Sequence, residues 1–380
     1  MRPARSPFRE IWINRAVQDW PVVAEILRCY PGVPRYYGDE PEFMAAPFSG
    51  NPKTRLWLTS CKGAAVKTCP GTCSPYLCCR YQVINQTLNC PLDCTYCILQ
   101  YYLNQSATVI AVDFDSLLDD VETLTHRNPR RFFRFGTGEL GDSLALAASR
   151  LFARHAIPRF SQISNALLEL KTKSTVIDDL LDAPHGGRTV LAWSLNPDSV
   201  VAGEERSAAS VGARLAAARR AQEAGYLLAF HFDPMIDKPD IETRYHQLAD
   251  RLYQALNPDR IAWISMGSLR FPPTLKDKIA ARHPLTRIIY AELVRGRDGK
   301  LRYPRPLRVA LYRSLYRRLT AISNPPFIYF CMESPEVWEE VTGAAPADNP
   351  ELDFRFAVSL YQRFPGLMKE PPRLTDYQQL

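Results

Sequence analysis

The chain has 380 residues, 46% of them hydrophobic and 23% charged, so it is long enough to bury a sizeable core. It has no run of 18 or more apolar residues, and its N-terminus, MRPARSPFREIWINRAVQDW, lacks the apolar stretch of a secretory signal. We therefore expect no membrane span and a cytoplasmic protein. The ten cysteines then indicate metal or redox chemistry rather than disulfides, and the net charge of +7 permits a nucleic-acid partner without requiring one.

Residues 1–84 are rich in proline, aromatic residues and cysteine and show little periodicity, so we expect an irregular N-terminal extension. This segment contains the stretch CPGTCSPYLCC, which has two interpretations. It is either a second metal site or a set of small buried residues that pack over the main domain. The candidate ligands are Cys69, Cys73, Cys78 and Cys79, with Cys61 as a spare. Adjacent cysteines rarely ligate one ion comfortably, which favours the packing interpretation.

Residues 85–290 alternate short β-branched or aromatic runs with amphipathic helical stretches. The predicted strands are VINQTLN, RFFRFGTGE, ALLELKTK, TVLAWSLNP, YLLAFHFDP and RIAWISMGS. The predicted helices are DFDSLLDDVETLTHR, DSLALAASRLFARH, TVIDDLLD, VGARLAAARRAQEAG, IETRYHQLADRLYQAL and PTLKDKIAAR. This alternation predicts an α/β fold with a parallel sheet. Polar residues gather where successive strands end, which favours a partial (β/α)6 barrel of the TIM type over an open sheet.

Residues 291–380 begin with a predicted hairpin, RGRDGKLRYP, whose Asp298-Gly299 pair is a turn signal. A helix (PLRVALYRSLYRRLTAI), a strand (FIYFCMES) and a short helix (PEVWEEV) follow. The hairpin and the first helix are basic: from Arg295 to Arg318 there are nine basic residues and one acidic residue. They form either a solvated basic face over an apolar stripe or a nucleic-acid surface that includes Arg302, Tyr303 and Arg317.

The stretch NCPLDCTYCILQ places Cys90, Cys94 and Cys97 in the spacing C-x3-C-x2-C, in the loop after the first predicted barrel strand. A structural zinc site needs a fourth ligand, but the next cysteine is Cys331 and the next histidine is His126. Three thiolates can instead hold an iron–sulfur cubane, one iron of which keeps an open coordination position.

The three cysteines, with Tyr96 before the last, resemble the radical S-adenosylmethionine superfamily. The stretches CTYCILQYYL, FGTGELGDSL, LKTKSTVIDDLLDAPHGGRTVLAWSLNP and GARLAAARRAQEAGY resemble its spore photoproduct lyase family. The resemblance covers roughly residues 85–290 and is not shared by residues 1–84.

The resemblance implies a [4Fe–4S] cluster held by the three loop cysteines, with S-adenosylmethionine on the open iron. Reduction by a one-electron donor of the flavodoxin or ferredoxin type would yield a 5′-deoxyadenosyl radical, which abstracts hydrogen from a DNA photolesion or another nucleic acid. The resemblance also implies residues that contact S-adenosylmethionine: Tyr96, Thr137, Gly138, Glu139, Lys173 and Ser194. The structural alternatives are a strand-to-helix turn at Gly138-Glu139, a solvated Lys173 and a helix cap at Ser194.

The chain departs from the family at two positions. Characterised members have a cysteine that returns hydrogen to the substrate radical where this chain has Gly136, and a tyrosine where it has Ile98. Cys331, the only cysteine after Cys97, is the leading replacement donor, although a buried structural role is the simpler interpretation. If the pocket admits the side chain, Gly136→Cys is expected to improve repair. The alternatives are a radical enzyme for RNA, a peptide or a small molecule, and a zinc-stabilised nucleic-acid-binding protein without catalysis.

Overall fold

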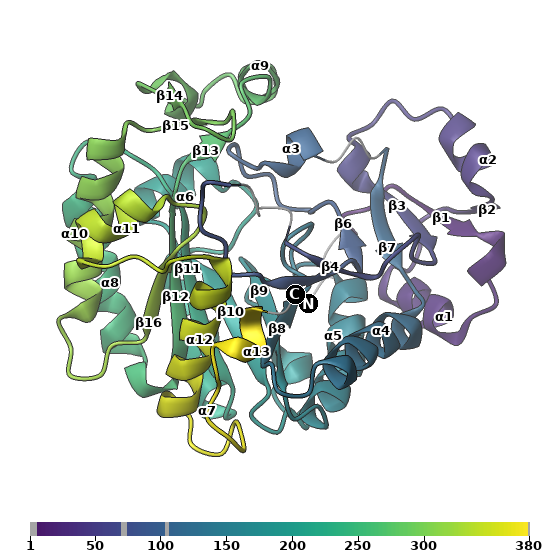
Figure 1. Ribbon diagram of the computed structural model, residues 1–380. Coiled ribbons are helices and arrows are strands. Elements are labelled where there is room, and N and C mark those ends of the chain that lie inside the picture. The colour runs from purple at the N-terminus through teal and green to yellow at the C-terminus, as the bar shows by residue number, and fades with distance from the viewer. Residues whose placement is uncertain (1–5, 70–73, 103–105, 379–380) are drawn as a thin grey trace.

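The computed structural model describes residues 6–69, 74–102 and 106–378, which form two sheets, a small three-stranded sheet and surrounding helices (Figure 1). The main sheet has eight strands. From one edge to the other they are β16 (Phe327–Phe330), β12 (Ile261–Ser268), β11 (Leu227–Met235), β10 (Thr189–Ser194), β9 (Ala166–Thr172), β8 (Phe133–Gly136), β5 (Gln82–Ile84) and β4 (Val66–Thr68). All neighbours are parallel except β4 and β5.

Six of these strands, β5 and β8 to β12, lie side by side in chain order and form the curled sheet of a half barrel, which confirms the predicted partial (β/α)6 barrel. Each predicted strand overlaps one of them, because a strand buried on both faces is a continuous apolar run. All eight residues of β12 are buried, for example. The first, VINQTLN, is predicted as one strand but is divided between the end of β5 and β6 (Thr87–Leu88), which belongs to the second sheet. The strand predicted from FIYFC, β16, extends the barrel sheet at one edge by pairing with β12.

Crossover helices lie on the outside of the curled sheet (Figure 1). They are α4 (Phe114–Arg127), α5 (Ala147–Ser161), α7 (Val211–Glu223) and α8 (Ile241–Ala255), whereas α6 (Asp198–Glu204) and α9 (Leu275–Arg282) lie toward the end at which the strands finish. Helix α7 starts at Ser210, whose side chain accepts a hydrogen bond from Ala213 N, and Gly225 follows its end with φ of +89°. The prediction of a helix from TVIDDLLD is wrong, because only a short 3₁₀ turn at Asp178–Leu180 forms there.

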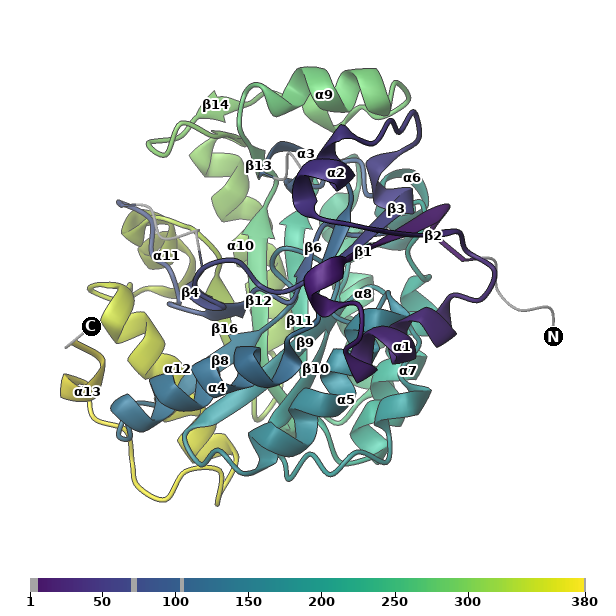
Figure 2. The ribbon, with the colours of Figure 1, turned by 90° about the vertical axis from the view of Figure 1, so that its right-hand side faces the viewer.

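The expectation that residues 1–84 are irregular is wrong. The second sheet consists of β2 (Arg35–Gly38), β1 (Glu10–Asn14), β3 (Arg55–Thr59), β7 (Thr108–Ala111) and β6 (Thr87–Leu88), with helices α1 (Pro21–Cys29) and α2 (Glu40–Ala45) beside it (Figure 2). Strands β6 and β7 come from beyond residue 84, whereas β4 and β5 come from before it and join the main sheet. Strand pairing in both sheets therefore crosses the domain boundary that was expected between residues 84 and 85.

The C-terminal segment forms the predicted hairpin and helices. Strands β14 (Val294–Arg295) and β15 (Leu301–Arg302) are antiparallel and β15 also pairs with β13 (Arg270–Phe271), while Gly299 in the turn has φ of +76°. The helices are α10 (Arg305–Thr320), α11 (Pro335–Thr342), α12 (Asn349–Arg363) and α13 (Thr375–Gln378). No helix in the described part of the chain is long and apolar enough to cross a membrane.

A buried ion cluster ties α12 to the barrel. Asp353 of α12 lies 2.8 Å from Nη2 of Arg131 and 3.3 Å from Nη2 of Arg134, and the side chains of all three residues are at most 4% exposed. Arg134 also lies over the ring of Phe356, with its guanidinium carbon 3.5 Å from the ring centroid. The two cations share this one carboxylate, so its loss would leave two buried positive charges without a counter-charge.

We therefore predict that Asp353→Ala lowers the free energy of unfolding by about 3–5 kcal/mol, the range for breaking a buried ion pair. The matched control is Glu223→Ala, which breaks the exposed pair with Arg219 and should have almost no effect. Urea unfolding followed by circular dichroism measures both. Equal unfolding midpoints for the two variants would contradict the prediction.

Candidate active site

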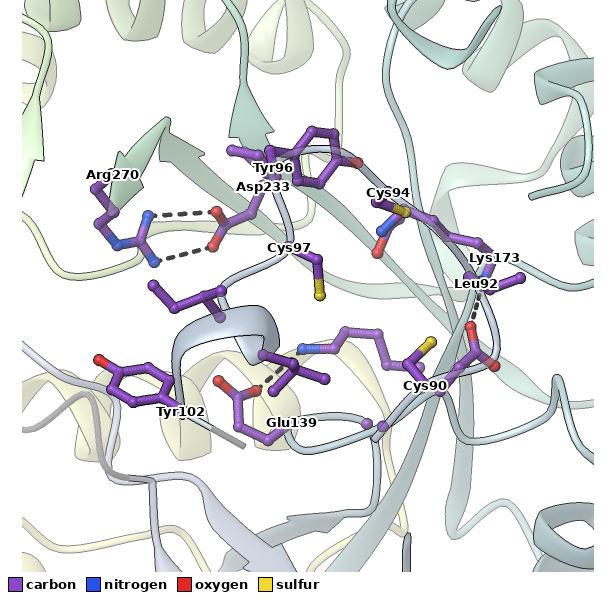
Figure 3. Close-up of a pocket in the computed structure, with 18 of the residues that line it drawn as sticks. Cys90, Leu92, Cys94, Tyr96, Cys97, Tyr102, Glu139, Lys173, Asp233 and Arg270 are labelled. Atoms are coloured by element: carbon purple, nitrogen blue, oxygen red, sulfur yellow. Dashed lines mark hydrogen bonds and ion pairs between the residues drawn. The ribbon is translucent and has the colours of Figure 1, made fainter. Parts of the chain in front are cut away.

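A cavity of about 240 Å³ opens at the C-terminal ends of the barrel strands (Figure 3). Each strand from β8 to β11 contributes residues to its wall, at or just beyond the strand's end: Gly138 and Glu139 after β8, Lys171 to Lys173 from β9, Ser194 from β10 and Asp233 from β11. The loop between β6 and α3 (Leu99–Tyr102) closes the cavity. This is the edge at which (β/α) barrels carry their chemistry.

The three loop cysteines all line this cavity, and their side chains face a common space (Figure 3). Asn89, with φ of +81°, turns the chain into the loop, and its side chain accepts a hydrogen bond from Cys90 N at 2.9 Å. The next turn is closed by Cys97 N, which donates to the carbonyl of Cys94 at 3.2 Å. The structure thus brings together the cysteines that the sequence singled out.

The chemistry of these thiols fits a bound metal cluster. Burial raises the pKa of Cys90 well above its ordinary value and that of Cys94 to about 12, while the charges of Lys53 and Lys173 oppose the shift at Cys94. Buried thiols with such pKa values stay protonated unless a metal cation stabilises the thiolates. Among the described residues, no three Cys, His, Asp or Glu side chains lie close enough together to bind one metal ion. An iron–sulfur cubane does not require this, because each of its thiolate ligands binds a different iron.

Two buried glutamates at the end of α6 hold the cysteine loop. Backbone atoms of Cys94 and Glu205 form a β-bridge, and the Tyr96 hydroxyl donates to the Glu205 carboxylate. Arg214 of α7 lies 2.5 Å from that carboxylate, and both side chains are fully buried. Glu204 accepts from Thr95 Oγ1 at 2.6 Å. These two glutamates were not predicted from the sequence, because nothing in the stretch GEERS indicates a contact with the cysteine loop, 109 residues earlier in the chain.

Of the residues expected to contact S-adenosylmethionine, Tyr96, Gly138, Glu139, Lys173 and Ser194 line the cavity. Thr137 does not: it is 3% exposed, and its hydroxyl pairs with Ser143 Oγ at 2.8 Å. The Thr137 side chain therefore lies behind the cavity wall, and its assignment as a cofactor contact stays a prediction.

Local packing fixes the positions of the glycine and the acid in this wall. Glu139 is held by Lys171, whose Nζ lies 3.1 Å from its carboxylate. A Cβ at Gly138 would lie 2.7 Å from Lys171 Cβ, so the glycine lets this lysine pass close to the backbone.

Asp142 was not expected from the sequence but organises the same wall. Its Oδ1 accepts from Ala145 N at 2.8 Å and from Thr172 Oγ1 at 2.6 Å, and its Oδ2 accepts from Lys173 N at 2.8 Å. Asp142 thereby joins the loop after β8 to the end of β9 and fixes the place of Lys173.

The far end of the cavity is lined by paired charges and includes residues that the sequence left unassigned. Asp233 and Arg270 form a two-pronged ion pair with both distances 3.3 Å (Figure 3), and Lys300 and Met332 complete the wall. His231, also left unassigned, lies inside the barrel instead, with Nε2 2.6 Å from Glu169 Oε1.

Cys331, the expected hydrogen donor, follows β16 directly and lies behind Arg270. Its sulfur accepts a hydrogen bond from Arg270 Nη2 at 3.3 Å, and burial raises the pKa of the thiol well above its ordinary value. Cys331 is therefore a protonated thiol next to the cavity wall, although it is not itself part of the lining.

Gly136 has no room for a side chain. A Cβ there would overlap the hydroxyl of Tyr81 and lie 2.6 Å from the carbonyl oxygen of Glu169. The Tyr81 side chain thus occupies the space that a residue larger than glycine would need. The expectation that Gly136→Cys improves the enzyme is corrected, because the pocket does not admit the cysteine.

The second group of cysteines is described only in part, because Cys73 lies outside the described residues. The thiols of Cys69 and Cys79 are both hydrogen-bonded with that of the buried Cys78. Cys69 Sγ also lies 3.9 Å from Glu139 Oε1. Among the described residues these thiols do not form a preorganised metal site.

The hairpin residues proposed as a nucleic-acid surface are buried. Arg302 is 1% exposed and pairs with Asp298 at 2.7 Å, and Tyr303 is fully buried, with its hydroxyl accepting from Asp237 N at 3.1 Å. Arg317 is exposed on α10, which packs against α8 on the outer face of the barrel. Neither Arg302 nor Tyr303 is available to phosphate groups, so the expectation of one continuous surface is corrected.

Together, the half barrel and the three-cysteine loop at its C-terminal edge define a (β/α)-barrel protein with three thiols at the strand ends, where such barrels carry their chemistry. The family model for spore photoproduct lyase matches residues 79–306, more than half of the chain, and the chain belongs to this family.

Curated relatives match over part of their length. The chain is 28% identical over 202 residues to spore photoproduct lyase of Bacillus subtilis (strain 168), which covers 52% of this chain and 59% of the relative. It is 27% identical over 221 residues to that of Geobacillus sp. (strain Y412MC61), covering 56% and 65%. The matched regions thus span less than two thirds of these relatives.

Solved structures share the fold. A spore photoproduct lyase complexed with dinucleoside spore photoproduct superposes with a TM-score of 0.76 at 21% identity, over 86% of this chain and all of that one. A spore photoproduct lyase variant with bound AdoMet and dinucleoside spore photoproduct gives the same values.

The crowding at Gly136 can be tested by stability alone. Gly136→Ala is predicted to lower the free energy of unfolding by about 1–3 kcal/mol, the usual cost of overpacking. The control is Gly203→Ala in α6, where the nearest atom to a new Cβ is Lys238 Nζ at 3.7 Å. That change should leave stability unchanged or raise it by up to about 1 kcal/mol. If Gly136→Ala is as stable as the wild type in urea unfolding, Tyr81 does not fill this space.

Proposed function

We propose that this protein is a radical S-adenosylmethionine enzyme that repairs a thymine photolesion of the spore photoproduct type in DNA. One observation carries the proposal: the three loop cysteines line the same cavity as Glu139, Lys173 and Ser194, at the C-terminal edge of a half barrel. Membership of the spore photoproduct lyase family and the shared fold support it. The reduced thiols that the site needs persist in the cytoplasm, which we propose as its location.

In this proposal Cys90, Cys94 and Cys97 hold a [4Fe–4S] cluster through their thiolates. When bound, the cluster supplies the electron that splits S-adenosylmethionine into methionine and a 5′-deoxyadenosyl radical. The protein's part is to orient the cofactor and exclude water. Glu139, kept in place by Lys171, receives the ammonium group of S-adenosylmethionine, and Lys173 and Ser194 take its other polar groups.

The far end of the cavity suits a polar substrate such as a DNA lesion. Arg270 and Lys300 line it, and the carboxylates of Asp233 and Asp298 hold them in place. Lysine and arginine side chains held in this way can donate hydrogen bonds to the oxygens of a two-nucleotide lesion. The solved relative complexed with dinucleoside spore photoproduct supports a lesion of this type as the substrate.

Cys331 is proposed to return the hydrogen atom to the substrate radical. Its S–H bond breaks as a C–H bond forms on the substrate, and the thiyl radical is left on the sulfur. The raised pKa keeps the group in the S–H form that this transfer requires. The sulfur lies directly behind Arg270, so the transfer requires the Arg270 side chain to move aside and let the substrate radical contact the thiol.

The cluster assignment predicts that Cys94→Ala loses most of its bound iron and sulfide after anaerobic reconstitution, because one thiolate ligand is gone. The exposed Cys29 provides the control, since Cys29→Ala should keep about four irons per chain as in the wild type. Iron and sulfide analysis with the visible absorption spectrum measures the loss. A colourless wild-type protein that binds zinc instead would contradict the assignment.

The donor assignment predicts that Cys331→Ala still releases 5′-deoxyadenosine from S-adenosylmethionine but converts spore photoproduct less cleanly. Without the thiol the product radical is quenched by other reagents, so abortive adducts should increase several-fold. Chromatography with mass spectrometry of the digested DNA separates thymine from the adducts, with Cys29→Ala again as the control. Clean, full-rate repair by Cys331→Ala would place the donor elsewhere.

A further inference from the structure

We propose that a basic notch beside the cysteine loop is the docking site for an acidic one-electron carrier protein of the flavodoxin or ferredoxin class. The notch is formed by Lys53, Lys278 and Arg282. The inference rests on the proposed function, because the radical reaction needs one electron per cleavage. The carrier is oxidised by one electron as the cluster is reduced by one.

The position of the notch relative to the cysteines is the first argument. It is a second cavity, of about 180 Å³, and Cys97 and Leu99 line both it and the main cavity. The loop that carries the third cysteine is therefore the wall between the two. Electron transfer weakens steeply with distance, so a carrier seated in the notch would approach the cluster site closely. It would also leave the main cavity free for S-adenosylmethionine and the lesion.

The notch is built by residues from three separate parts of the chain. Lys53 comes from the N-terminal sheet region and is only 8% exposed. Its Nζ donates to the Leu92 carbonyl at 2.5 Å and lies 3.5 Å from Asp93 of the cysteine loop. Arg282, at the end of α9, lies 2.6 Å from the same carboxylate. One aspartate thus anchors two cations under the loop.

The charge of the notch is positive beyond what Asp93 neutralises. Lys278 on α9 is exposed, and Arg206 lies nearby. The buried His283 is affected by this charge: burial lowers its pKa and Asp93 opposes the shift, while Arg282, Arg206 and Lys53 lower it further. Such a surface attracts an acidic protein and speeds its association at low salt.

Apolar groups on the elements beside the notch indicate a protein partner rather than a small anion. Tyr101 of α3 is 37% exposed, and Lys278 Nζ lies 5.9 Å from the centroid of its ring. Leu285, just beyond α9, is 81% exposed. Helices α3 and α9 pack together at one end of the molecule (Figures 1 and 2). Protein interfaces combine aromatic and aliphatic side chains with arginine in this manner.

The test uses the reconstituted full-length protein and a flavodoxin of negative net charge as the probe. The variant is Lys278→Glu, because Lys278 is exposed and has no ion pair with the cysteine loop, unlike Lys53 and Arg282. The matched control is Lys369→Glu, which makes the same change in net charge in the α12–α13 connection, at the opposite end of the molecule (Figure 1). Isothermal titration at two salt concentrations gives the affinity for flavodoxin. Separate assays measure 5′-deoxyadenosine release with flavodoxin and with dithionite as the reductant.

We expect the notch variant to bind flavodoxin at least tenfold more weakly, with a flatter salt dependence, and to react slowly with flavodoxin but normally with dithionite. The control should match the wild type in all assays. Unchanged flavodoxin affinity in the notch variant would overturn the proposal. If the notch variant lost affinity for DNA but kept its affinity for flavodoxin, the proposal would also be overturned, and the notch would be a nucleic-acid site. If the wild type released no 5′-deoxyadenosine with dithionite, the proposed function would fail while the binding data still decided the docking site.

Discussion

The buried contact between Glu205 and the cysteine loop is the interaction on which the site depends. The loop has almost no regular structure of its own, so backbone hydrogen bonding within the loop cannot fix the three sulfurs. Instead the strand-like bridge from Cys94 to Glu205 and the Tyr96 hydroxyl bond join the loop to the end of α6. Arg214 keeps the Glu205 carboxylate charged in the interior: burial alone would raise its pKa, but Lys173 and Arg214 bring the pKa below its ordinary value.

The same network connects the cofactor side of the cavity to the barrel. Lys173 follows β9, and its backbone is fixed by Asp142, while its charge faces Glu205. The cysteine loop and the residues proposed to bind S-adenosylmethionine are therefore oriented by a single set of buried charges. A buried ion pair of this kind contributes little net stability, but the loss of one partner is costly, so it favours one arrangement of the loop over others.

The sequence predicts the half barrel because each of its parallel strands is a short apolar run between helical stretches. It also predicts the three cysteines as a group, since their spacing is local. It does not predict the N-terminal sheet, whose strands have only two to five residues and which includes β7 from beyond the cysteine loop. Asp142, Glu205 and Arg270 were missed for a related reason: each acts on residues distant in sequence. Arg302 and Tyr303 look like surface residues in the sequence, but the hairpin folds them inward against Asp298 and Asp237.

Electron paramagnetic resonance of the reduced, reconstituted protein, recorded with and without S-adenosylmethionine, tests the central claim most directly. Three protein thiolates leave one iron open, so the account predicts the signal of a reduced [4Fe–4S] cluster whose g values change when S-adenosylmethionine is added. Glu205→Gln, which keeps the size of the side chain but removes its charge, should weaken this change by loosening the loop. A cluster signal that is identical with and without S-adenosylmethionine, or no cluster signal at all, would contradict the account.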